Sequence, residues 1–196
     1  GREHDLVQRR DLLELLNCLP QNGLLLDVGC GTGHWSRFFH SLGYEVHGID
    51  ISEVMLRMAL RYASECAFSA ADARALPFRD ASFDVAACMA TLEFITAPGP
   101  AVKEMARCVK PGGSLIIGTL NRLSELNRER LSRGEQPYAS GQLLSPRELW
   151  DLLSPWGRPR MLASPSRQSP AGLVTDLPPD RTSSLAGAFI IAEVRR

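Results

Sequence analysis

Glycines at alternate positions, Gly29, Gly31 and Gly33, form the clearest chemical signal in the sequence. They follow an apolar run, residues 24–28, in which Asp27 is the only charge, and such a run predicts a buried central strand of a parallel sheet. Glycine lets the backbone turn tightly and leaves no side chain between the backbone and a bound ligand. The pattern therefore predicts a ligand-binding turn at the end of a central strand.

An acid stands at a matching distance from this turn. The next predicted strand, residues 44–50, ends at Asp50, which lies 21 residues beyond Gly29. An acid about 20 residues after a glycine-rich turn is the arrangement that binds the ribose hydroxyls of a nucleotide-like cofactor. A helix connects the two strands, because apolar residues return at helical spacing after the turn: Trp35, Phe38, Phe39 and Leu42.

The glycine spacing bears on whether the turn binds a dinucleotide cofactor. A dinucleotide fingerprint G-x-G-x-x-G needs glycine at position 34, where this chain has His34. The chain also lacks a Tyr-x-x-x-Lys pair. Both features disfavour an NAD-dependent oxidoreductase, which remains the less favoured alternative.

Longer motifs carry a family resemblance. Leu-Asp-Val-Gly-Cys-Gly-Thr-Gly, residues 26–33, resembles the first motif of class I S-adenosylmethionine (SAM)-dependent methyltransferases. Residues 76–84, Leu-Pro-Phe-Arg-Asp-Ala-Ser-Phe-Asp, and residues 109–113, Val-Lys-Pro-Gly-Gly, are similar to small members related to the quinone-biosynthesis enzymes. The resemblance covers residues 24–153. It departs at the N-terminus, where many relatives have an aromatic segment that closes over the cofactor and this chain shows none.

The resemblance implies one α/β domain over residues 1–196: a doubly wound, mostly parallel seven-stranded sheet with helices on both faces, the Rossmann-like methyltransferase fold. The implied strand order is 3-2-1-4-5-7-6, with the last strand antiparallel. Alternating strand and helix patterns independently favour a doubly wound sheet. The predicted helices cover residues 5–19, 35–42, 52–62, 100–109 and 146–153, the last opened by a capping box, and the predicted strands cover residues 24–28, 44–50, 66–71, 85–90, 114–119, 160–163 and 188–194.

Residues 121–144 and 164–187 are longer than connections need to be, since most run about 4–6 residues. In a parallel sheet both would emerge at the carboxyl edge, where ligands bind. We expect them to cover the substrate, and for residues 164–187 a mobile loop is an equal alternative, given its Pro and Ser content.

The resemblance further implies SAM as the methyl donor and S-adenosylhomocysteine (SAH) as its product. Asp50 would accept both ribose hydroxyls, and Asp72 would accept a hydrogen bond from the adenine amino group. The implied cofactor contacts are Gly29, Cys30, Gly31, Asp50, Ile51, Met55, Asp72, Ala73 and Met89. The acceptor would be a small molecule, with Glu93, Asn121 and Tyr138 as candidate contacts. No catalytic base stands out, because a base is required only if the nucleophile arrives protonated.

Composition bears on the remaining classes of function: nucleic-acid binding, metal binding and membrane insertion. Lys+Arg and Asp+Glu balance at 22 each, which leaves no basic footprint for nucleic acid. Five cysteines without a C-x-x-C pair suit a reducing cytoplasm, and the four histidines lack metal-ligand spacing. No apolar stretch approaches the roughly 20 residues of a membrane span. A SAM-binding sensor or partner subunit without catalysis remains an alternative, because binding and turnover share the same motifs; the oligomeric state stays open.

Overall fold

The computed structural model describes residues 22–136, 138–164, 173–175 and 185–196. The predicted helix over residues 5–19 and most of the predicted insertion at residues 164–187 lie outside this described part.

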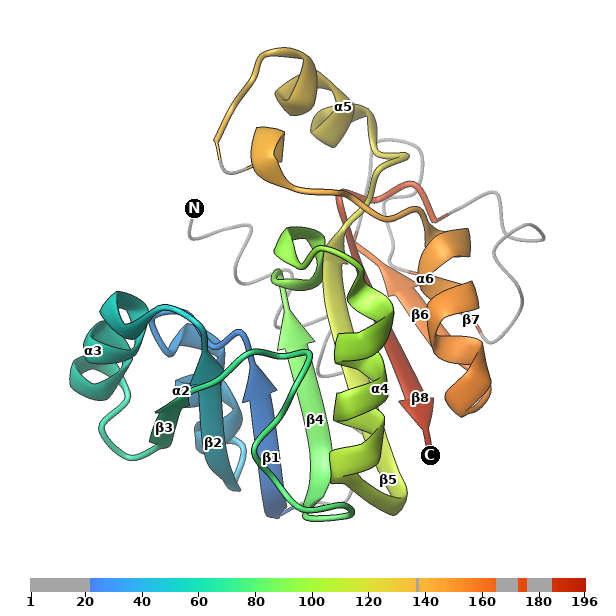
Figure 1. Ribbon diagram of the computed structural model, residues 1–196. Helices are drawn as coiled ribbons and strands as arrows, with labels where there is room; N and C mark the ends of the chain where they lie inside the picture. Colours follow the sequence, from blue (N-terminus) through green and yellow to red (C-terminus); the bar gives the residue numbers. More distant parts are fainter. Residues whose placement is uncertain (1–21, 137, 165–172, 176–184) are drawn as a thin grey trace.

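The described residues form one mixed sheet with the strand order β3-β2-β1-β4-β5-β8-β6-β7 (Figure 1). The strands β1 to β5 run parallel to one another, whereas β8 is antiparallel to both β5 and β6. The predicted seventh strand corresponds to β8 in the structure. With that correspondence, the predicted order of seven strands and the antiparallel last strand are confirmed. The strands are β1 (Gly23–Val28), β2 (Tyr44–Asp50), β3 (Ala67–Ala70), β4 (Phe83–Met89), β5 (Val109–Leu120), β6 (Arg160–Ala163), β7 (Leu173–Thr175) and β8 (Phe189–Arg195).

The short strand β7 was not predicted. It pairs antiparallel with β6 and lies at the end of the sheet, within the segment expected to be a substrate-covering insertion or a loop. Part of that segment therefore extends the sheet.

Helices cover both faces of the sheet, as a doubly wound fold requires. Side chains alternate along β4, so that Val85 and Ala87 belong to one core cluster while Ala86 and Cys88 belong to the other. Helices α4 and α6 contribute to the cluster of Ala86, and α2 contributes Phe39 to the opposite one. The described helices are α2 (His34–Ser41), α3 (Glu53–Tyr62), α4 (Pro98–Cys108), α5 (Glu125–Ser132) and α6 (Pro146–Leu153).

The predicted capping box opens α6. Ser145 Oγ accepts a hydrogen bond from the Glu148 amide, and the Glu148 carboxylate accepts one from the Ser145 amide. None of the helices in the described part of the chain is both long and apolar enough to cross a lipid bilayer.

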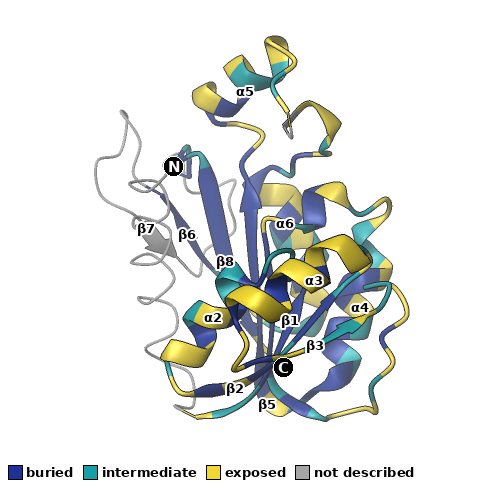
Figure 2. Cartoon of the chain, turned by 90° about the vertical axis from the view of Figure 1, so that its left-hand side faces the viewer, coloured by how far each residue is buried: buried dark blue, intermediate teal, exposed yellow. Residues whose placement is uncertain are grey.

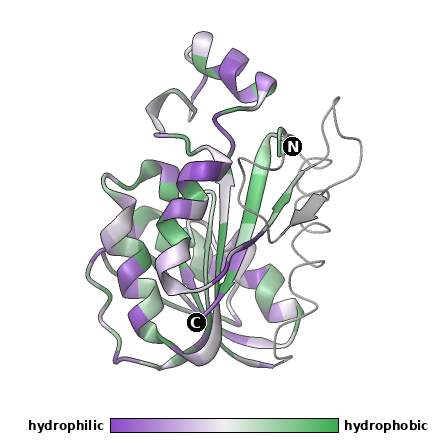
Figure 3. Ribbon diagram, turned by 90° about the vertical axis from the view of Figure 1, so that its right-hand side faces the viewer, coloured by the Kyte–Doolittle hydropathy of each residue, from purple (hydrophilic) through white to green (hydrophobic). Residues whose placement is uncertain are grey.

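Residues 121–144 stand beyond the carboxyl edge of the sheet and contain α5 (Figure 1). Much of α5 is exposed, in contrast to the buried strands (Figure 2). Hydropathy follows the same division, since hydrophilic residues dominate α5 and hydrophobic stretches lie along the strands (Figure 3).

Buried amides anchor this insertion to the segment that leads into β8. Asn121 Nδ2 donates to the carbonyl oxygens of Leu185 and Gly187, at 2.8 Å each. Asn127 Nδ2 donates to the carbonyl oxygens of Asn121 and Ala188, at 2.9 and 2.6 Å. The protruding insertion is thus fixed at its base by hydrogen bonds from two buried side-chain amides.

We expect Asn127→Ala to lower the free energy of unfolding by about 1–3 kcal/mol, because two hydrogen bonds from its Nδ2 to backbone carbonyl oxygens are lost at the base of the insertion. Urea unfolding measures the change. The exposed neighbour Arg128 supplies a control, since Arg128→Ala should stay within about 0.5 kcal/mol of the wild type. Equal effects of the two variants would contradict the anchoring role of Asn127.

Candidate active site

The glycine turn follows β1 and folds over the end of β2. Gly29, Gly31 and Gly33 all have left-handed backbone conformations, with φ of 71°, 53° and 81°. The amides of Gly29 and Cys30 both donate to the carbonyl oxygen of Ile49, at 2.8 and 2.9 Å. A Cβ atom added to Gly29 would lie 2.1 Å from the Thr91 methyl group, so both the conformation and the space at this position require glycine.

The carboxylate of Asp50 is held by the same turn. Its Oδ2 accepts a hydrogen bond from the Gly31 amide at 2.9 Å, and its Oδ1 accepts one from the Ser52 amide at 2.8 Å. A carboxylate has about four lone-pair sites, so each oxygen can accept a further hydrogen bond. Asp50 is therefore oriented by the backbone and retains capacity for a ligand.

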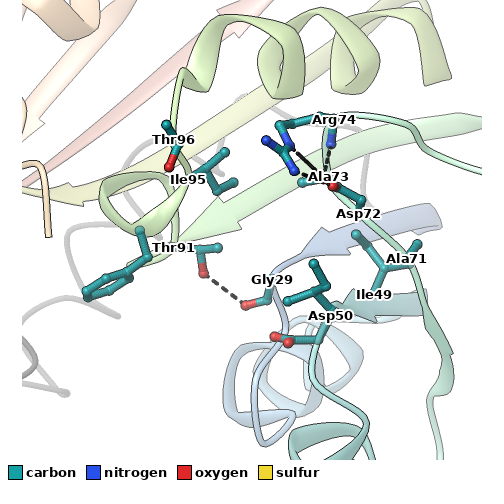
Figure 4. Close-up of a pocket in the computed structure, with 12 residues that line it drawn as sticks. Gly29, Ile49, Asp50, Ala71, Asp72, Ala73, Arg74, Thr91, Ile95 and Thr96 are labelled. Atoms are coloured by element: carbon teal, nitrogen blue, oxygen red, sulfur yellow. Dashed lines mark hydrogen bonds and ion pairs between the residues drawn. The ribbon is translucent and has the colours of Figure 1, made fainter. Parts of the chain in front are cut away.

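A pocket of about 200 Å³ opens at this edge of the sheet (Figure 4). Of the predicted cofactor contacts, Gly29, Asp50, Ile51, Asp72 and Ala73 line it. Its other lining residues are Ile49, Ala71, Arg74, Thr91, Phe94, Ile95 and Thr96. The ends of β1, β2, β3 and β4 thus converge on one cavity.

The remaining predicted cofactor contacts lie around the pocket. Gly31 reaches it through the hydrogen bond to Asp50. Cys30 and Met89 are buried, and Met55 is exposed on α3. None of these four is among the lining residues.

Arg74, which the sequence analysis missed, forms a fork with Asp72 (Figure 4). Its Nη2 donates to Asp72 Oδ2 at 2.7 Å and its Nε donates to Oδ1 at 3.0 Å. These hydrogen bonds lower the pKa of Asp72 to about 2. Asp72 is therefore a carboxylate throughout the neutral range, and its orientation is set by Arg74.

The segment between β4 and α4 supplies the lining residues that the sequence analysis missed on this side, namely Thr91, Phe94, Ile95 and Thr96. Ala90 and Ala97 flank it, and both are left-handed, with φ of 53° and 57°. The position of this segment after β4 was a signal in the sequence, because in a doubly wound sheet ligands bind beyond the carboxyl ends of the strands. That signal indicates the segment but not which of its side chains face the pocket.

Buried acids lie beside the pocket. Asp27 is fully buried and accepts a hydrogen bond from Ser36 Oγ at 2.6 Å; burial raises its pKa to about 7. Glu93 is 1% exposed, and its Oε2 accepts a hydrogen bond from Thr119 Oγ1 at 3.1 Å. Burial also raises the pKa of Glu93. The Asp27 carboxyl group is thus disposed to hold a proton near neutral pH.

The other candidate acceptor contacts belong to the insertion. Asn121 is fully buried, with its Nδ2 donating to two carbonyl oxygens and its Oδ1 accepting from the Leu123 amide. Its amide therefore supports the fold at this point. Tyr138 begins a short 3-10 helix, Tyr138–Ser140, and its side chain lies outside the described part. No cluster of three metal-ligating side chains occurs among the described residues.

Comparison with known proteins relates this chain to methyltransferases. A family model described as a methyltransferase domain matches residues 26–117. A malonyl-[acyl-carrier protein] O-methyltransferase of Pseudescherichia vulneris is 34% identical over 157 residues, which are 78% of this chain and 62% of the relative. A ubiquinone biosynthesis O-methyltransferase of Burkholderia cenocepacia is 35% identical over 139 residues, covering 63% of this chain and 59% of the relative. The chain thus spans about three fifths of the length of these relatives.

Solved structures agree on the fold. A Thermotoga maritima protein described as a SAM-dependent methyltransferase, possible histamine N-methyltransferase, has a TM-score of 0.77 and 25% identity, covering 99% of this chain and 94% of its own. The phosphoethanolamine N-methyltransferase 2 of Haemonchus contortus, solved with SAM, has a TM-score of 0.65 and 23% identity over 79% of this chain and 37% of its own.

We expect the stability of the protein to depend on pH through Asp27. The folded state holds this proton with a pKa of about 7 instead of the ordinary 3.8, so the free energy of unfolding should fall as pH rises between these values and then level off. The fall is at most about 4 kcal/mol, since each pKa unit corresponds to about 1.4 kcal/mol.

The Asp27→Asn variant should lose most of this dependence, because the amide cannot ionise. Chemical unfolding of both proteins at about pH 4 and about pH 8 tests this. A difference between wild type and variant that is the same at both pH values would contradict the titration of Asp27.

Proposed function

Because the chain belongs to the class I SAM-dependent methyltransferase family, we propose that it transfers the methyl group of SAM to a small-molecule acceptor. The hydrogen bond between the Gly31 amide and Asp50 Oδ2 carries this proposal. It joins the glycine turn to an acid that keeps acceptor capacity beside a pocket, which is what recognition of a ribose at the end of β2 requires.

The residues present fit the cofactor. A Cβ atom added at Gly31 would meet no heavy atom within 4 Å, so the turn has open space beside it for the methionine part. Asp50 would accept the ribose hydroxyls, and Asp72 with Ala73 and Ile51 would surround the adenine. Cys30, Met55 and Met89 would support these groups from outside the pocket lining.

When bound, SAM supplies a methyl group on a sulfonium centre that is already activated. The chain's own residues must then hold the acceptor atom within about 3–3.5 Å and in line with the bond that breaks, and exclude water. This chemistry needs positioning more than it needs a strong base, because a base is required only if the nucleophile arrives protonated.

For the acceptor, Glu93 is the residue we propose. Its Oε2 is held by Thr119, and its Oε1 has no hydrogen-bond partner among the described residues. A buried acceptor without a partner is costly, and a hydroxyl or amine of a substrate would satisfy it. Since the two curated relatives above are O-methyltransferases, we propose oxygen acceptors first.

Binding and turnover test the proposal separately. Isothermal titration should show binding of SAM and SAH and no measurable binding of NAD. Mass spectrometry should then detect a methylated product in a panel of small hydroxylated acceptors. Tighter binding of NAD than of SAM would contradict the proposal. Binding of SAM without product for any acceptor would favour a SAM-binding protein without catalysis.

We expect Asp50→Ala to weaken SAH binding by roughly 30- to 1000-fold, because two hydrogen bonds to a charged group are lost at about 1.5–3 kcal/mol each and are partly additive. Calorimetry measures the affinity, and thermal unfolding checks the fold. Glu45→Ala, an exposed position on the same strand, is the matched control. Binding of SAH to the Asp50 variant within about threefold of wild type would exclude Asp50 as the ribose acid.

A further inference from the structure

Exposed apolar side chains concentrate on one helix, α3. It packs on β3 and β2 at one end of the sheet (Figure 1), and much of its surface is exposed (Figure 2). Of the nine large hydrophobic residues that are exposed in the described part of the chain, six lie on α3 or directly before it: Ile51, Val54, Met55, Met58, Leu60 and Tyr62. Single exposed apolar residues are ordinary, whereas a contiguous group marks an interaction site.

Three of these side chains form a row along α3. Val54, Met58 and Tyr62 follow one another at intervals of four residues, and they are 58%, 51% and 44% exposed. Rows at this interval are the ridges by which helices most often pack against one another. Another side of α3 already packs on the domain, since Leu56 and Ala59 are buried. The helix therefore has a buried face and, apart from it, an apolar ridge that faces solvent.

Contacts with α2 hold one end of this ridge. The Tyr62 ring stacks on the His34 ring, with centroids 6.2 Å apart and an interplanar angle of 19°. The Arg37 guanidinium lies 5.0 Å from the centroid of the Tyr62 ring. A side chain that is already held in place loses less conformational freedom when it enters an interface. The ridge is therefore pre-organised for association at its largest side chain.

A second row, next to the first, carries charge. Glu53, Arg57 and Arg61 also recur at intervals of four residues, with the acid at the N-terminal end of α3 and Arg61 near its C-terminal end. Within one copy, Glu53 Oε2 and Arg57 Nη1 are 3.6 Å apart, and both side chains are more than half exposed. Exposed pairs of this kind contribute little to stability. The charges of this row therefore remain open to a partner.

Both rows are complementary to an antiparallel copy of themselves. Reversing the helix about Met58 places Met58 opposite its own equivalent and Val54 opposite the partner's Tyr62, so that an apolar row meets an apolar row. The same reversal brings Glu53 towards the partner's Arg61 at both ends of the contact. A parallel copy would instead place each charge beside its like, which is unfavourable.

We propose that α3 is the surface through which two copies of this chain associate, with Val54, Met58 and Tyr62 at its centre and Glu53 paired with the partner's Arg61 at its rim. An isologous contact of this kind closes with two copies. A ten-residue helix is about 15 Å long, so the contact lies at the small end of protein interfaces and the dimer is weak and reversible. Ile51 lines the pocket and directly precedes the N-cap of α3, so this surface borders the pocket.

Sedimentation velocity of the full chain at concentrations of about 1–200 µM tests the proposal. The wild type should shift from monomer to dimer as its concentration rises. Met58→Glu places two carboxylates at the centre of the contact and should raise the dissociation constant at least about tenfold, because like charges that face each other repel. Leu126→Glu, at an exposed apolar position on α5, is the matched control and should leave the equilibrium unchanged. Thermal unfolding checks that each variant is folded.

A charge exchange tests the antiparallel arrangement. Glu53→Arg and Arg61→Glu should each raise the dissociation constant about three- to tenfold, because each places like charges at both ends of the contact. The double variant restores opposite charges and should recover the wild-type dissociation constant within about threefold. Apolar association alone does not depend on the signs of these charges, so recovery in the double variant is specific to the proposed pairs.

A wild type that stays monomeric at every concentration would overturn the proposal, as would a dimer that Met58→Glu leaves intact. A double variant that dimerises no better than the single ones would contradict the antiparallel pairing. Flotation with phosphatidylglycerol vesicles tests another occupant that suits an apolar ridge beside arginines. Vesicle binding by a monomeric wild type, lost in Met58→Glu, would assign the ridge to a lipid surface in place of a second copy.

Discussion

The site depends on one hydrogen bond, from the Gly31 amide to the carboxylate of Asp50. This bond forms because β1 and β2 are parallel and in register, with Val28 opposite Ile49, so that their carboxyl ends meet at one edge. The left-handed turn after β1 then directs its amides towards β2, where Gly29 and Cys30 donate to Ile49 and Gly31 donates to Asp50. The acid acquires its orientation from backbone groups, which cannot be displaced by rotation of a side chain.

The same central strand carries an unfavourable group. Asp27 is fully buried, and burial of a carboxyl group raises its pKa. Its neighbours Leu26 and Val28 are fully buried, as expected for a strand covered by helices on both faces. A buried acid in the middle of this strand conflicts with the rule that central strands of parallel sheets are apolar. Such conflicts concentrate at functional sites. Its hydrogen bond to Ser36 connects β1 to α2 directly beneath the glycine turn.

Local patterns in the sequence predict most of the fold. Hydrophobic runs, the capping box at Ser145 and the glycine turn each depend on neighbouring residues, and the strand order followed from the family resemblance. Asp50 could be found because its distance from the turn is fixed by one strand–helix–strand unit. The structural role of Asn121 could not be predicted from the sequence, because its hydrogen-bond partners Leu185 and Gly187 are 64 and 66 residues away.

Thr91 and Arg74 were missed for a different reason. Thr91 reaches the pocket because Ala90 is left-handed, and alanine gives no sequence signal for that conformation, unlike glycine. Arg74 pairs with Asp72 two positions away, and the two residue types alone do not specify that pairing. In both cases the residue type is ordinary, and the backbone conformation decides the contact.

The segment between β4 and α4 contributes to both the proposed cofactor site and the proposed acceptor site. Thr91 contacts the turn after β1, while the Glu93 carboxylate contacts Thr119 on β5. The insertion of residues 121–144 contacts the same segment, since the Gln142 amide donates to the Glu93 carbonyl oxygen at 2.7 Å. Cofactor and acceptor would therefore share one wall, held at Ala90 and Ala97 by left-handed backbone. In a methyl transfer that depends on alignment, a shared wall fixes the acceptor relative to the methyl donor without a separate catalytic group.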